Sequence, residues 1–108
     1  MLYLKNWNIE EQTGYKPITS FYLDFSIAEK FGIDGIEDTY KRGLQDAVNM
    51  GYKALTEFVM VLNWKIWEHY QANEPLARVY DSLWKEADEY AMEHLKGKEL
   101  SYYYKTTD

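Results

Sequence analysis

The chain has 108 residues, with 18 acidic against 12 basic side chains and a formal net charge of −6. Its length is typical of one domain, so we predict a single folded unit over residues 1–108 with enough apolar content for a core. The absence of cysteine excludes disulfides, thiolate nucleophiles and the common cysteine-containing zinc sites. The acidic balance argues against direct binding to nucleic acid or to an anionic membrane.

The first nineteen residues show no clear helical period and contain Gly14 and Pro17. We predict that residues 1–19 form an arm, either irregular or containing a short strand. They lack the charged-then-apolar pattern of a signal peptide, and the longest apolar stretch, residues 58–62, is too short to span a bilayer. The expected location is the cytoplasm.

Helix signals dominate from Ser20 onward. A first helix is predicted from Phe21 or Ile27 to about Phe31. Ser26 and Glu29 have the spacing of a capping box at a helix start, and Gly32 suits the helix end. A second helix is predicted over residues 35–50, capped by Asp34.

Two features refine the prediction for residues 35–50. The pairs Glu37–Lys41 and Asp38–Arg42 have the spacing and order that favour ion pairs on a helix. Gly43 lies on the apolar face at a cost in helix propensity, which indicates the close approach of another helix. Gly51 is the expected break.

The third predicted helix, over residues 53–72, is apolar on two sides. One stripe contains Leu55, Phe58, Val59, Leu62 and Ile66, and the opposite stripe contains Met60, Trp64 and Trp67. Such a helix is either central in a bundle or presents one side to a partner.

The fourth helix is predicted over residues 75–96, because Pro75 after Asn73 suits a first turn. The tail, residues 97–108, contains Tyr102, Tyr103 and Tyr104 and is predicted to be a short strand or an ordered arm. The fold class is therefore mainly α, a bundle of three to four helices over residues 20–96.

The sequence offers no obvious catalytic or cofactor site. Glu-x-x-His, the motif of carboxylate-bridged metal bundles, is missing because Ile66 and Ala91 precede the two histidines by three residues. His94 lies on the apolar face of its helix and is expected to be hydrogen-bonded and largely buried. No nucleophile elbow or phosphate-binding glycine loop is present. We therefore predict no catalytic, cofactor-binding or metal-binding residues.

Five segments carry a resemblance to a known group of proteins: Asp24–Ala28, Asp38–Tyr40, Leu55–Asn63, Leu95–Gly97 and Thr106–Asp108. From about Thr19 onward the chain resembles an uncharacterised family of small proteins carried on mobile genetic elements of gut bacteria. The resemblance implies a cytoplasmic accessory protein of a phage-like or conjugative element. It implies no activity and no site residues.

The aromatic content points to binding rather than catalysis, since tyrosine and tryptophan are enriched at protein interfaces. Our first hypothesis is a non-catalytic interaction protein that binds an unknown protein through Met60, Trp64, Trp67, Tyr102, Tyr103 and Tyr104. The stripe Met60, Trp64 and Trp67 could also join two copies in a weak homodimer, unless the N-terminal arm covers it through Trp7. The alternative is an acidic inhibitor that occupies the nucleic-acid-binding groove of another protein through Asp81, Asp88, Glu89 and Glu93. A small enzyme is the remote alternative.

Overall fold

The computed structural model describes residues 20–107, and over this range the protein is mainly α. The elements in chain order are α3 (Ser20–Ala28), the 3-10 turn η1 (Glu29–Phe31), α4 (Gly32–Met50), α5 (Tyr52–His69), α6 (Glu74–His94) and α7 (Lys98–Thr107). Residues 20–107 contain no strand. The predicted N-terminal arm lies outside the described residues.

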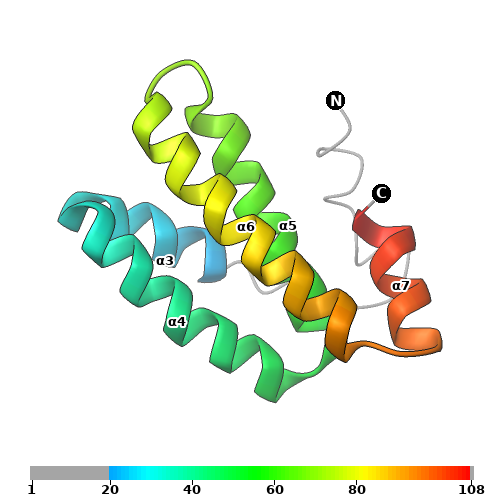
Figure 1. Cartoon of the computed structure of the whole chain (residues 1–108). Helices are drawn as coiled ribbons and strands as arrows, with labels where there is room; N and C mark the ends of the chain where they lie inside the picture. The colour runs from blue at the N-terminus through cyan, green and yellow to red at the C-terminus, as the bar shows by residue number, and fades with distance from the viewer. Residues whose placement is uncertain (1–19, 108) are drawn as a thin grey trace.

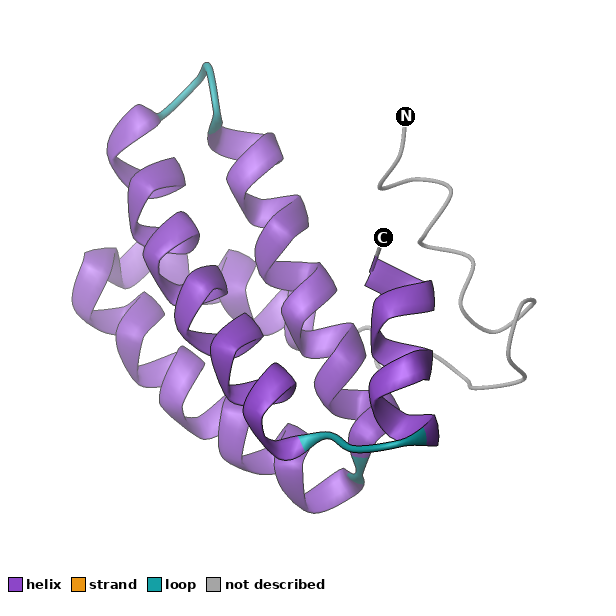
Figure 2. Ribbon diagram, turned by 45° about the vertical axis from the view of Figure 1, so that its right-hand side comes forward, coloured by secondary structure: helices purple, strands orange, loops and turns teal. Residues whose placement is uncertain are grey.

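The centre of the fold is α5. It pairs with α6 in an antiparallel hairpin, with α3 and α4 on one side of the hairpin and α7 on the other (Figures 1 and 2). Because α5 contacts four helices, both of its apolar sides are covered over most of their length: Phe58 and Leu62 are buried, and so are Met60 and Trp64, whereas Trp67 near the end of the helix is exposed. This arrangement confirms that a helix apolar on two sides occupies the middle of the bundle.

Phe58 is the meeting point of the aromatic core. Its ring lies 5.1 Å from that of Phe21 in an edge-to-face arrangement and 5.8 Å from the rings of Phe25 and Tyr40. A Cβ atom at Gly43 would lie 2.6 Å from Phe58 Cε1, so α4 can approach α5 this closely only with glycine there. The predicted close approach at Gly43 is confirmed.

The helix ends agree with the sequence at two places and differ at two. Gly51 separates α4 from α5, and the Asn73 side chain accepts a hydrogen bond from the Leu76 amide at 3.3 Å at the start of α6. The predicted caps are wrong, because Ser26 lies inside α3 and Asp34 lies inside α4. The turn is made instead by Gly32, whose φ of 76° lets the chain reverse directly from η1 into α4.

The tail prediction is also wrong, because residues 98–107 form α7 rather than a strand or an extended arm. Tyr103 and Thr106, three residues apart, are buried on the face that α7 turns toward the bundle. The Tyr103 hydroxyl donates a hydrogen bond to Asp88 of α6, and the Tyr102 ring packs edge-on against Tyr52 at 5.2 Å. Side-chain contacts therefore attach the helix to both α5 and α6.

Candidate functional site

Seven side chains from four elements form a network, which we name the Lys65 cluster. Its members are Tyr22, Ser26, Glu29, Lys65, Glu68, His69 and Tyr80. The cluster joins α3 and η1 to α5 and α6. Every contact from α3 or η1 to α5 or α6 in the cluster spans 36 or more residues of sequence, so none of these contacts is dictated by local spacing.

Lys65 is the centre of the cluster and its side chain is fully buried. Its Nζ atom lies 3.1 Å from Glu29 Oε2 and 2.8 Å from Glu68 Oε2, and it donates a hydrogen bond to Ser26 Oγ at 2.8 Å. The ammonium also lies 4.3 Å from the centroid of the Tyr22 ring, in cation–π geometry. Two carboxylates, a hydroxyl and an aromatic face thus replace the water that a buried ammonium loses.

Glu29 is the second centre. Its Oε2 atom lies 3.0 Å from His69 Nε2 and accepts a hydrogen bond of 2.6 Å from the Tyr80 hydroxyl. The His69 ring stacks on Tyr80 with 5.8 Å between centroids and an interplanar angle of 5°. His69 also lies 3.3 Å from Glu68 Oε2, while Tyr22 donates to the other oxygen of Glu68.

These contacts determine the charge states of the acids. Burial by itself would raise the pKa of Glu29, but hydrogen bonds from Tyr80, His69 and Lys65 outweigh it and hold that pKa below its usual 4.5. The pKa of Glu68 is lowered in the same way, against its burial, by Lys65 and Tyr22. Burial and the bond to Glu29 raise the pKa of Tyr80 well above its usual range, so the phenol remains a donor.

The cluster has the composition of a reactive site, but its central ammonium is buried. Glu29, Glu68 and His69 offer three ligand atoms within 4.8 Å of one another, a spacing that could hold a metal ion. The Lys65 ammonium already supplies the positive charge between the two carboxylates, and a divalent ion would have to displace it. Lys65 lines none of the three pockets described for residues 20–107. These features favour a structural role.

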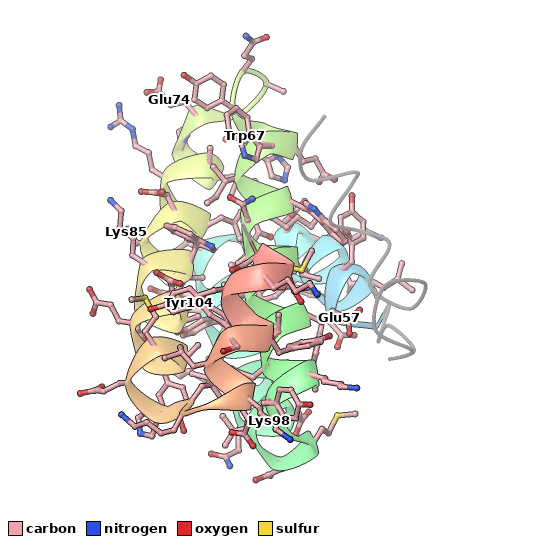
Figure 3. All side chains as sticks on the ribbon, turned by 90° about the vertical axis from the view of Figure 1, so that its right-hand side faces the viewer. Glu57, Trp67, Glu74, Lys85, Lys98 and Tyr104 are labelled. Carbon is pink, nitrogen blue, oxygen red and sulfur yellow. The ribbon has the colours of Figure 1, made fainter. Side chains whose placement is uncertain are left out.

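The six aromatic and methionine positions predicted as an interaction surface do not form one surface. Met60, Trp64 and Tyr103 are buried around a cavity of about 70 Å³. Trp67 is exposed near the α5–α6 turn, apart from the exposed Tyr104 on α7 (Figure 3); Tyr102 is half-buried. Of the two alternatives for this stripe, internal packing holds for Met60 and Trp64, because the tail forms a helix that packs on α5, while Trp67 is exposed. The homodimer stays a prediction.

The acids of the alternative surface are only partly available. Asp81 lies 3.1 Å from Lys85 in an ion pair, and Asp88 accepts the Tyr103 hydroxyl, while Glu89 and Glu93 are exposed. The four positions therefore do not act as one free anionic face.

The expectation for His94 is half right. Its Nδ1 atom lies 2.9 Å from the Tyr90 carbonyl oxygen and its ring stacks on Tyr90 with 3.9 Å between centroids, but the side chain is exposed.

A groove between α3 and α4 was not anticipated. It has a volume of about 560 Å³, and its apolar lining includes Ile27, Ala28 and Phe31. Arg42 is the single basic residue of the lining. The acidic lining consists of four exposed aspartates: Asp24, Asp34, Asp38 and Asp46.

Among residues 20–107, no ion pair neutralises the acids of this groove. Within residues 20–107 none of the four aspartates is in an ion pair, and the predicted pairs Glu37–Lys41 and Asp38–Arg42 do not form. Arg42 instead lies 3.5 Å from the hydroxyl of Thr39.

One signal for the Lys65 cluster was present in the sequence. Lys65 is a charged residue between apolar neighbours in a helix predicted to be central, and a buried ammonium requires an acidic partner. Its partner Glu29 has the local spacing of a capping box with Ser26. Local spacing does not reveal the contact with Lys65, which is made across 36 residues of sequence. Nothing local indicated that Tyr80 would complete the network.

Over residues 20–107 no helix combines the length and apolar character needed to cross a bilayer. The resemblance to proteins of mobile elements stays a prediction. Comparisons with models of protein families, with curated protein sequences and with solved structures find no match for this chain.

Proposed function

We propose that this chain is a non-catalytic protein-interaction protein and that its binding surface lies on α3, η1 and α4. The observation that carries the proposal is a row of exposed apolar side chains, which we name the α3 ridge: Leu23, Ile27 and Phe31, exposed by 58%, 55% and 74%. They follow one another at intervals of four residues, so Leu23 and Ile27 lie on one face of α3 and Phe31 continues it.

The α3 ridge is unusual because other large apolar side chains of the same helix are buried in the core. Phe21 and Phe25, on the opposite face of the same helix, are buried against Phe58. An apolar row on the outside of a helix whose inside is already packed is typical of a surface that binds another protein. Ile33, at the start of α4, extends the exposed apolar surface.

Site-specific photo-crosslinking tests this proposal. A photoreactive amino acid is placed at Leu23 or Ile27 in the full chain, and at Ser82 or Glu89, exposed positions on α6, as matched controls. In extracts of the source organism we expect one discrete adduct from the ridge positions, identified by mass spectrometry, and none from the controls. Equal adducts from all four positions, or none from the ridge, would contradict the proposal.

A second measurement separates binding from folding. We expect Phe31→Glu to abolish the adduct formed at Leu23 while changing the far-UV circular dichroism and the thermal midpoint little, because Phe31 is 74% exposed and has little packing to lose. Loss of the adduct together with loss of helical signal would attribute the effect to unfolding.

A further inference from the structure

The α3–α4 groove restricts the chemistry of the partner, if the interaction function proposed above holds. We propose that the groove receives a basic amphipathic helix, which packs its apolar side on Ile27 and Phe31 and directs lysine or arginine side chains toward the groove's aspartates. The juxtaposition that supports this inference is an apolar lining bordered by four exposed carboxylates that have no ion pair within the described chain.

Charge complementarity selects a basic partner. Four aspartates against Arg42 give the lining a net charge of −3. Because these carboxylates are exposed on the groove lining, they repel acidic chains. An approaching basic segment gains attraction from several carboxylates at once and is discriminated from acidic competitors.

Backbone hydrogen bonding selects a helix. The groove is bounded by α3 and α4, whose backbone groups are already paired within the helices, so the lining offers no strand edge to an extended peptide. A helix satisfies its own backbone and needs only side-chain contacts, which is the usual mode for apolar grooves between helices.

The dimensions of the groove set the length of the partner. Asp34 and Asp46 lie twelve positions apart on α4, which corresponds to about 18 Å along the helix axis. A partner helix of about three to four turns covers this distance. Shorter segments reach only part of the acidic lining.

Binding of designed peptides to the full chain tests the inference. The probe is a fluorescent peptide of about four helical turns with leucine on one face and lysine on the other. The controls are the same peptide with glutamate in place of lysine and a peptide of the same composition in which the helical spacing is scrambled. We expect binding of the leucine–lysine peptide alone, and weaker binding as salt is raised, because surface charges are screened.

Charge reversal in the protein assigns the binding to the groove. We expect Asp34→Lys with Asp38→Lys to weaken the leucine–lysine peptide by about tenfold or more and to confer binding of the leucine–glutamate peptide. The matched control, Glu89→Lys with Glu93→Lys on α6, makes the same change in net charge away from the groove and should leave the affinity within about twofold.

The outcomes separate this inference from the function on which it rests. If the α3 ridge crosslinks to a protein but the leucine–lysine peptide does not bind, the interaction function stands and the proposed partner chemistry is wrong. The basic-helix proposal is also overturned if both charge-reversed variants weaken peptide binding equally. It is overturned as well if a photoreactive group at Ile27 crosslinks only to residues 1–19 or to a second copy of the chain. Absence of both peptide binding and crosslinks overturns both proposals.

Discussion

Replacing Lys65 with methionine removes the central charge of the Lys65 cluster while keeping a side chain of similar length. Glu29 and Glu68 then remain together without the ammonium that lies 3.1 and 2.8 Å from them. His69 remains near both acids. The variant therefore changes the charge pairing of the cluster more than its packing.

The size of the effect follows from the burial of the two acids. Removing one partner of a fully buried ion pair costs about 3–5 kcal/mol. The side chains of Glu29 and Glu68 retain 17% and 36% of their exposure, so water partly screens them and we expect a loss of about 2–3 kcal/mol at neutral pH. With a urea m-value of about 1–2 kcal/mol per molar, the unfolding midpoint falls by about 1–3 M.

The loss should depend on pH. The folded-state pKa values of Glu29 and Glu68 lie below 4.5, so these acids contribute stability that is present above their unfolded pKa and is lost as the pH falls through the folded pKa. In Lys65→Met the burial of the acids remains while the contribution of Lys65 is absent, so we expect their pKa values to rise. The wild type therefore loses more stability in acid than the variant does.

Urea unfolding followed by far-UV circular dichroism measures both effects. We expect the difference in unfolding free energy between wild type and Lys65→Met to be at least halved between pH 7 and about pH 4. Lys85→Met, which breaks the exposed pair with Asp81, should cost about 0–1 kcal/mol. The same comparison in a His69→Gln background removes the histidine that lies beside both acids. If the loss for Lys65→Met is the same at both pH values in both backgrounds, the charge-pairing argument is refuted and the effect is due to packing.

Three further substitutions test the helix contacts. Gly43→Ala should destabilise by about 1–3 kcal/mol in thermal unfolding, despite its better helix propensity, because the new Cβ meets the buried Phe58 ring; a stabilised variant would show that α4 can shift. Leu62→Ala should cost about 2–5 kcal/mol and half-buried Leu83→Ala less, so equal losses in urea would contradict the observed helix faces. Asn73→Ala should cost about 1 kcal/mol and Asn73→Asp almost nothing, whereas equal losses would exclude capping.

Local signals predicted the long helices well. Gly51 and the Asn73–Pro75 segment mark chain breaks whatever the tertiary structure, and the stripes of α5 require neighbours on both sides. The tail was mispredicted because Tyr102, Tyr103 and Tyr104 are residues that favour strands, and their helical state depends on contacts with Asp88 and α5. Tertiary contacts therefore override local preference there.

The candidate sites were less predictable than the fold. Ser26 and Glu29 satisfy a local capping pattern, yet they serve Lys65 on another helix. The α3–α4 groove depends on the angle at which the chain turns from α3 into α4 at Gly32. The apolar period of a single helix does not predict that angle.

The Lys65 cluster also bears on the order in which the chain folds. The α5–α6 hairpin closes through a short turn, so its contacts carry a small loop-closure cost. The cluster joins residues 22–29 to residues on both α5 and α6, so its geometry is complete only when that hairpin exists. Residues 22–29 are synthesised before α5 and α6 but therefore reach their final place after the hairpin has formed. Directional polar contacts as well as apolar burial hold them there. Those contacts fix the rotation of α3 about its axis, and with it the direction in which the α3 ridge faces solvent.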